Sequence, residues 1–157
     1  MNFKPLAGLF LAAVIMPTLA SAELSGSARV VDGDTITIAG ERIRLDGIDA
    51  PEGRQMCQRQ DEAWECGKVA RDALEEFLSG SPVECQGNNR DRYGRLIARC
   101  YVAGVEVNEW LVRHGWALDW PRYSDGRYAE AQFEAQRERR GIWDSKFTPP
   151  WEWRQQN

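Results

Sequence analysis

The chain has 157 residues, of which 20 are lysine or arginine and 24 are aspartate or glutamate, so its formal net charge is −4. This acidic balance argues against a general nucleic-acid coat protein, because such proteins carry an excess of basic residues. The length suits one domain that buries a sizeable core without metals or repeats.

The first 22 residues have the pattern of a signal peptide. Lys4 gives a short positive start, residues 6–15 are almost entirely apolar, and Ala20-Ser21-Ala22 fits a small-residue cleavage site. No later stretch is apolar and long enough to span a bilayer. We therefore expect an exported protein, periplasmic or secreted, with residues 23–157 forming one domain that has no membrane contact after cleavage.

Residues 30–48 predict a strand, a turn and a second strand. Isoleucine alternates with threonine before Gly40, and apolar residues alternate with arginine after it. A turn centred near Gly40 places Asp34 opposite residue 47 or so. Asp34 and Asp49 should therefore meet at the open end of this hairpin, although they are 15 positions apart in the sequence.

The rest of the chain alternates between short strands and helices. Residues 53–66 are too polar and irregular to predict anything but a loop, and a helix with one apolar face follows over 68–79. After it we expect a second hairpin, two helices and a tail rich in Trp and Pro that packs back on the body: 82–85 with 96–102, 108–114, 125–140 and 142–157. This order suggests an α+β protein, mainly a small closed β-barrel with helices on its surface.

The four cysteines, behind a signal peptide, predict two disulfides in an oxidising compartment. Three pairings are possible, and we favour Cys57–Cys66, which closes a loop, and Cys85–Cys100, which bridges two strands. A zinc site is the alternative. It is disfavoured because the chain has no CxxC pair and a single histidine, His114.

Charge is distributed unevenly along the chain. Residues 23–53 hold seven acids against three arginines, whereas residues 88–99 hold four arginines against one acid. Seventeen of the 20 basic residues are arginine, whose planar fork suits phosphate and carboxylate. One region could hold a cation and the other an anion, so the net charge alone does not exclude a polyanionic substrate.

Five motifs in order give the chain a resemblance to the thermonuclease (staphylococcal nuclease) family. They are VDGDT (31–35), RLDGIDAPE (44–52), DRYGR (91–95), NEWLVRHG (108–115) and RGIW (140–143). Each is weak alone, but their order is specific, and they extend over nearly all of the chain after the signal peptide. The resemblance implies an OB-fold-like five-stranded barrel with three surface helices.

Asp34 and Asp49 offer the hard oxygen ligands that Ca²⁺ prefers, with waters and a backbone carbonyl completing the shell. The resemblance implies Ca²⁺ bound by these two carboxylates and by the carbonyl of Ala50. Asp32 matches a nearby acid that we place outside the direct ligands. The alternative is that these aspartates only cap turns.

The resemblance also supplies the groups that act on the phosphate. Glu52 matches the proposed general base for the attacking water, and Arg44 and Arg95 match two arginines that contact the scissile phosphate. Arg92 matches a residue near a nucleotide phosphate, with a plain turn residue as the alternative. Tyr123 is the aromatic residue that we expect at the nucleotide, and Trp120 is the reserve.

The sequence therefore favours an exported, Ca²⁺-dependent phosphodiesterase that hydrolyses DNA and RNA. By resemblance, water attacks phosphorus and the 5′-oxygen leaves, giving 3′-phosphate products, and the protein is expected to be a monomer. One rival hypothesis is a non-catalytic OB-type module that binds single strands or another oligomer. Another is a disulfide-stapled interaction protein whose motifs serve only the fold.

Overall fold

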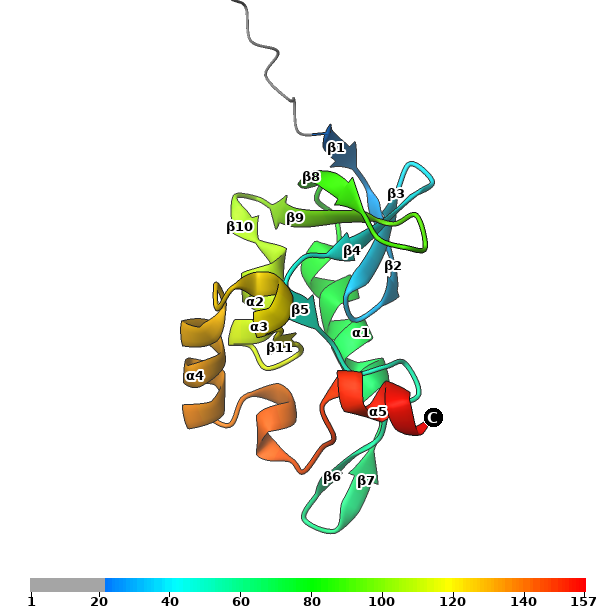
Figure 1. Ribbon diagram of the computed structural model, residues 1–157. Helices are drawn as coiled ribbons and strands as arrows, with labels where there is room; N and C mark the ends of the chain where they lie inside the picture. Colours follow the sequence, from blue (N-terminus) through cyan, green and yellow to red (C-terminus); the bar gives the residue numbers. More distant parts are fainter. Residues whose placement is uncertain (1–21) are drawn as a thin grey trace, which may run out of the picture.

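The computed structural model describes residues 22–157. The predicted signal peptide lies outside these residues, apart from Ala22 at its end. A curled β-sheet forms one end of the molecule, and helices gather at the other (Figure 1). In the described part of the chain, no helix is long and apolar enough to cross a membrane.

The main sheet has seven strands. Its order is β1-β8-β9-β4-β3-β2, and the short β10 pairs with β9. The strands are β1 (Ala22–Gly26), β2 (Ala28–Asp32), β3 (Thr35–Ile38), β4 (Glu41–Leu45), β8 (Val83–Arg90), β9 (Leu96–Val102) and β10 (Val105–Glu106). Two small pairs lie outside it: β5 (Ile48–Asp49) with β11 (Leu118–Asp119), and β6 (Cys57–Arg59) with β7 (Glu62–Trp64).

The predicted first hairpin is present as β3 and β4. Its turn uses Ala39 and Gly40, both with positive φ. Thr35 pairs with Arg44, and the amide of Leu45 donates to the carbonyl of Asp34 at 2.9 Å. Asp34 therefore lies opposite Leu45 and not opposite residue 47, because the turn is centred between Ala39 and Gly40, earlier than predicted.

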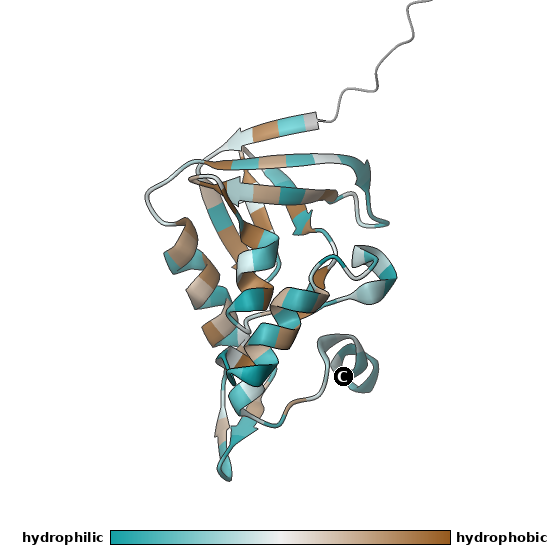
Figure 2. Ribbon diagram, turned by 90° about the vertical axis from the view of Figure 1, so that its left-hand side faces the viewer, coloured by the Kyte–Doolittle hydropathy of each residue, from teal (hydrophilic) through white to brown (hydrophobic). Residues whose placement is uncertain are grey.

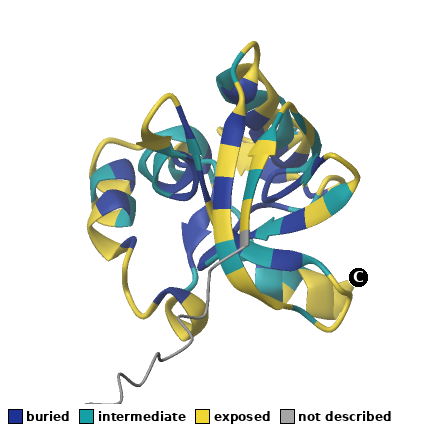
Figure 3. Ribbon diagram, turned by 90° about the horizontal axis from the view of Figure 1, so that it is seen from above, coloured by how far each residue is buried: buried dark blue, intermediate teal, exposed yellow. Residues whose placement is uncertain are grey.

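The core lies inside the curl of the sheet. Inward-facing residues such as Ile36, Ile38 and Ile43 are fully buried, and they alternate with more exposed neighbours along the strands (Figure 3). β4 pairs in parallel with β9, which joins the first hairpin to the second. Helices α1 (Cys66–Leu78) and α2 (Val107–Arg113) contribute Leu74 and Leu111 to the same core, and apolar and polar residues alternate along these helices (Figure 2).

The described part of the chain contains more helices than the three expected. They are α1 (Cys66–Leu78), α2 (Val107–Arg113), α3 (Pro121–Ser124), α4 (Ala129–Arg137), the 3-10 helix η1 (Gly141–Asp144) and α5 (Pro150–Gln156). The single helix predicted over 125–140 is wrong at its start. Asp125 and Gly126 take left-handed φ values of 54° and 74°, which end α3 and separate it from α4.

The segment predicted to be a loop over 53–66 contains the β6–β7 hairpin. Gln60 and Asp61 make its turn with positive φ, an arrangement that the sequence does not signal because neither residue is glycine. The Cys57–Cys66 disulfide joins this hairpin to the start of α1. The second disulfide, Cys85–Cys100, links paired residues of β8 and β9, so both favoured bonds are present.

The C-terminal tail packs back on the body, as expected. The amide of Lys146 pairs with the carbonyl of Gln58, and the ring of Trp151 stacks against Trp120 with centroids 5.9 Å apart. The α+β class and the barrel-like curl of the sheet are confirmed. The sheet has seven strands, two more than the resemblance implied, with β1 and β2 at the ends of its order.

Candidate active site

Arg44 joins the two aspartates at the open end of the first hairpin. Its Nη1 lies 2.8 Å from Oδ2 of Asp34, and its Nη2 lies 2.8 Å from Oδ1 of Asp49. The amide of Ala50 also donates to Oδ2 of Asp34 at 2.8 Å. Gly33 allows this close packing, because a Cβ there would come within 2.7 Å of the Cβ of Ala50. The structure therefore brings Asp34, Arg44 and Asp49 into one cluster.

The carboxylates of this cluster are crowded and largely removed from water. Asp49 is 0% exposed and Asp34 is 8% exposed. Burial raises the pKa of Asp49 to about 6, against the opposing hydrogen bond from Arg154 and charge of Arg44. Burial and the charge of Asp34 likewise raise the pKa of Asp32 to about 6. Extra positive charge here would therefore stabilise the ionised carboxylates.

The donor set fits a hard cation only in part. Asp34 and Asp49 supply the carboxylate oxygens that Ca²⁺ prefers. Among residues 22–157, however, no group of three or more His, Cys, Asp or Glu side chains is arranged to hold a metal ion. Asp32 accepts a hydrogen bond from the amide of Asp34 at 3.2 Å and supports the loop. A cation would need backbone carbonyl, water or substrate oxygens beside the two aspartates.

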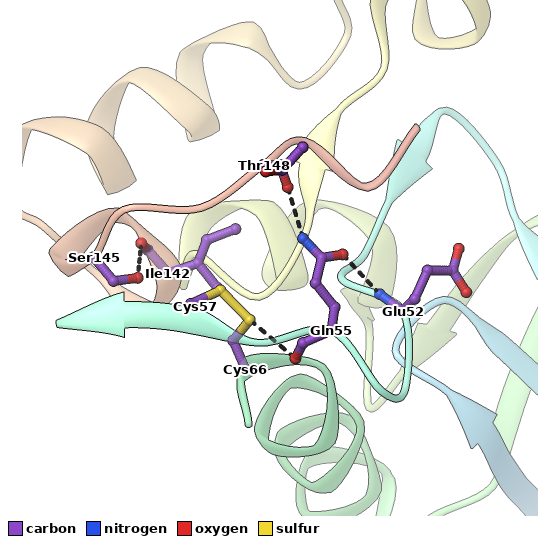
Figure 4. The surroundings of a disulfide bond; sticks show 7 residues. All are labelled: Glu52, Gln55, Cys57, Cys66, Ile142, Ser145 and Thr148. Atoms are coloured by element: carbon purple, nitrogen blue, oxygen red, sulfur yellow. Dashed lines mark hydrogen bonds between the residues drawn. A yellow bond between two sulfur atoms is a disulfide. The ribbon is translucent and has the colours of Figure 1, made fainter. Parts of the chain in front are cut away.

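Glu52 projects from a short loop that distant segments hold in place (Figure 4). The side chain of Gln55 is fully buried: its Oε1 accepts from the amide of Glu52 at 3.1 Å, and its Nε2 donates to the carbonyl of Thr148 at 2.6 Å. The Sγ of Cys66 contacts the carbonyl of Gln55 at 3.4 Å. Gly67 at the start of α1 is required, because a Cβ there would collide with the carbonyl oxygen of Glu52.

Arg95 is oriented by its own turn. Asp91 accepts from the Nε of Arg95 at 2.7 Å and from the amides of Tyr93 and Arg95. The Nη1 of Arg95 donates to Oγ1 of Thr35 at 3.2 Å, next to Asp34 in the sequence. Burial opposes ionisation of Asp91, but these hydrogen bonds hold its pKa below the usual value.

One cavity of about 640 Å³ gathers most of the predicted site residues. Its walls include Asp32, Asp34, Arg44, Glu52, Arg92, Arg95 and Tyr123. Asp49 and Ala50 do not line it, because Asp49 lies behind the guanidinium groups of Arg44 and Arg154. A second cavity, of about 500 Å³ between the β6–β7 hairpin and η1, contains none of the predicted residues.

The predicted substrate-binding residues, Arg92 and Tyr123, both line the large cavity. The Nη2 of Arg92 donates to the hydroxyl of Tyr93 at 2.7 Å, and its guanidinium lies 4.8 Å from the centre of that ring. Tyr123 is 53% exposed and meets Trp120 edge-on at 4.5 Å. Trp120, the reserve choice, lines the cavity beside Tyr123.

Sequence reasoning missed three residues of the site: Tyr93 and Arg154, which line the cavity, and Gln55, which supports Glu52. Tyr93 stands in the DRYGR motif, so the motif itself could have indicated it. Gln55 and Arg154 gave no signal, because their contacts join residues 93 and 102 or more positions apart. Arg154 pairs with both Asp49 and Glu52, at 2.9 and 2.6 Å.

The chain has clear similarity to known proteins. Residues 42–145 match the model of a family described as staphylococcal nuclease homologue. Over 141 residues the chain is 45% identical to a succinoglycan biosynthesis protein, ExoI, of Rhizobium meliloti, with 87% of this chain and 74% of the relative covered. It is 37% identical over 133 residues to an uncharacterized endonuclease of Escherichia coli O157:H7, with 80% and 81% covered. A probable staphylococcal-like nuclease, CAN1, of rice (Oryza sativa subsp. japonica) is 37% identical over 125 residues, which are 78% of this chain and 35% of that protein. The chain therefore belongs to the family of staphylococcal nuclease homologues.

Proposed function

We propose that the protein is an exported nuclease that hydrolyses phosphodiester bonds of DNA and RNA with the help of Ca²⁺. The observation that carries this proposal is that one cavity gathers Glu52, Arg44, Arg95 and Asp34, with Asp49 directly behind Arg44. Two of the relatives are named as an endonuclease and a nuclease, which agrees with this chemistry.

In the proposed reaction, arginines hold the substrate and a carboxylate handles the proton. Arg44 and Arg95 bind the oxygens of the scissile phosphate, where negative charge accumulates in the transition state. Glu52 accepts the proton of the water that attacks phosphorus, and the 5′-oxygen leaves, giving a 3′-phosphate. A Ca²⁺ ion held by Asp34 and Asp49 would neutralise charge and polarise water there. Arg92 and Tyr123 bind the neighbouring nucleotide.

Export as a monomer with one domain over 23–157 belongs to the same proposal. Export is supported by the two disulfides, because such bonds persist in oxidising compartments and are rare in the cytosol. The presence of the protein in periplasmic or culture fractions, at the mass expected after cleavage near Ala22, would test it.

A hydrolysis assay on denatured DNA and on RNA tests the activity. We expect cleavage with millimolar Ca²⁺ and none with excess chelator. Glu52→Gln should still bind single strands but lose at least about a hundredfold in rate, since general base catalysis contributes roughly that much. Absence of hydrolysis at every Ca²⁺ concentration would reject the proposal. Binding without hydrolysis by the unaltered chain would indicate the non-catalytic module instead.

A further inference from the structure

Arg154 stands among the proposed catalytic residues although it belongs to the C-terminal helix α5. Its Nη2 lies 2.9 Å from Oδ2 of Asp49, and its Nη1 lies 3.0 Å from Oδ1 of the same carboxylate. Nη1 also donates to Oε1 of Glu52 at 2.6 Å. Helix α5 begins after residue 145, where the match to the family ends. These contacts therefore come from outside the matched region.

The tail holds this guanidinium over the cavity by packing of its own. Trp151 stacks on Trp120 with an interplanar angle of 15°, and the guanidinium of Arg154 lies 5.5 Å from the centre of the Trp120 ring. The buried Gln55 fixes the irregular segment before the helix through the carbonyl of Thr148. Arg154 is therefore presented to the cavity by the body of the protein.

Asp49 is sealed by two guanidinium groups. Its side chain is 0% exposed: Arg44 and Arg154 both donate to Oδ1, and Arg154 donates to Oδ2. A cation that binds Asp49 has to displace one of these donors. The side chain of Arg44 is only 13% exposed and is also paired with Asp34, whereas that of Arg154 is 36% exposed. Arg154 is therefore the group that can move.

Once it is displaced from Asp49, the guanidinium group of Arg154 can bind an anion in the cavity. A divalent cation at Asp49 takes over the neutralisation of that carboxylate and repels the guanidinium. The cavity holds three other arginines, Arg44, Arg92 and Arg95, beside five carboxylates, and Glu52 can keep one N–H group of Arg154. An anion that enters the cavity can therefore be shared by several guanidinium groups. A phosphate group of a nucleic acid matches the planar fork of arginine through two parallel hydrogen bonds.

We propose that Arg154 is a further substrate-binding residue, which leaves Asp49 when a cation binds there and then binds a phosphate group of the nucleic acid. The inference rests on the proposed nuclease function and adds one residue to the same site. It also adds a phosphate contact to a chain whose net charge is −4 and whose long-range attraction for polyanions is weak.

The first measurement is Ca²⁺ binding in the absence of nucleic acid. Tryptophan fluorescence reports the binding, because Trp120 lies under the guanidinium group of Arg154. Arg154→Ala should bind Ca²⁺ about fivefold more tightly, since the competing positive charge at Asp49 is gone. Arg154→Lys should stay close to the unaltered protein. Arg137→Ala is the matched control, because it removes one charge from an exposed site that does not line the cavity.

The second measurement is binding of a fluorescein-labelled, ten-nucleotide single-stranded DNA by anisotropy, with saturating Ca²⁺ and in a Glu52→Gln background that prevents cleavage. Adding Arg154→Ala should weaken binding about tenfold, the loss expected for one charge-assisted hydrogen-bonded contact. The slope of log affinity against log salt should fall by about 0.7, as for one lost phosphate contact on a single strand. Arg137→Ala should change neither value.

Tighter Ca²⁺ binding together with weaker DNA binding by Arg154→Ala supports the proposal. Unchanged Ca²⁺ affinity, or weaker Ca²⁺ binding, overturns it, because Arg154 then does not compete at Asp49. Unchanged DNA affinity overturns it as well. If the Glu52→Gln parent binds no DNA with Ca²⁺ present, the proposed function fails along with the inference. Whether or not Arg154→Ala alone impairs DNA binding, the proposed function stays intact.

Discussion

The two charged regions of the site are built in different ways. The carboxylate cluster, Asp34 with Asp49 and Arg44, is held together by contacts that link segments up to 105 positions apart, because Arg154 also binds Asp49. The arginine turn, residues 91–95, is closed by contacts within five residues, from Asp91 to the amides of Tyr93 and Arg95 and to the Arg95 side chain.

Because of this difference, we expect substitutions in the two regions to affect the stability of the fold to different degrees. In the cluster, each buried charge depends on a partner that another element supplies, so the loss of one group leaves others uncompensated. In the turn, Asp91 takes its partners from its own motif, and only the contact of Arg95 with Thr35 reaches another element. Substitutions in the cluster should therefore damage both folding and hydrolysis, whereas those in the turn should mainly affect how phosphate is held.

The largest effect is expected for Asp49→Asn compared with Asp91→Asn. Replacing the fully buried carboxylate of Asp49 leaves Arg44 and Arg154 without their shared charged partner, while burial already opposes the ionisation of Asp49, so the net loss should be about 1–3 kcal/mol of unfolding free energy. Hydrolysis should fall about a thousandfold or more. Asp91→Asn should cost about 1 kcal/mol or less, since its ion pair is partly exposed. Urea unfolding and initial rates measure both. Equal losses of stability would remove the contrast between the regions.

The sequence contained the local parts of the site and missed the distant ones. The alternating pattern around Gly40 placed Asp34 near Asp49, because a hairpin fixes its own register. DRYGR closes on itself, so its arginines could be placed from the motif alone. Arg154 could not be placed, since nothing in a polar C-terminal segment signals a contact with residue 49. The helix expected over 125–140 failed because Asp125 adopts a left-handed conformation that its residue type permits but does not require.

The two disulfides give the next comparison, because only one of them touches the support of Glu52. Removal of either bond, with paired Cys→Ser changes, should cost roughly 3 kcal/mol on the chain-entropy model. Loss of Cys57–Cys66 should also lower kcat several-fold, since Cys66 contacts Gln55 and Gln55 holds the amide of Glu52. Loss of Cys85–Cys100 should leave kcat unchanged in the folded protein. If both pairs affect kcat equally, the Glu52 loop is not held in the way described.

A smaller effect separates the two arginines that bind the scissile phosphate. Arg44→Lys should lower kcat/KM about a hundredfold, because an ammonium group cannot bridge Asp34 and Asp49 and face the phosphate at once. Arg95→Lys should lose about tenfold, since its neighbours Asp91 and Thr35 can still position a single positive charge. Steady-state rates on a short single strand measure both. A greater loss in Arg95→Lys would place the main phosphate contact in the turn.

The smallest effect is a difference in pH dependence between Asp32 and Asp91. The pKa of Asp32 is raised from 3.8 to about 6 by burial and by the charge of Asp34, so between these values the folded state holds a proton that the unfolded state has lost. Its stabilising contribution is complete below about pH 4 and disappears as the pH rises to 6.

The contribution of Asp91 has the opposite pH dependence. Hydrogen bonds lower the pKa of Asp91, so its stabilising contribution is present above about pH 4 and is lost as the pH falls below that value. In urea unfolding at intervals from pH 3 to 7, Asp32→Asn should reduce the fall in stability between pH 4 and 6 by about 1 kcal/mol, with solvent screening allowed for. Part of the fall should persist, because Asp49 titrates in the same range. Asp91→Asn should act only below pH 4, and an effect of Asp91→Asn between pH 4 and 6 would show that the two regions titrate as one unit.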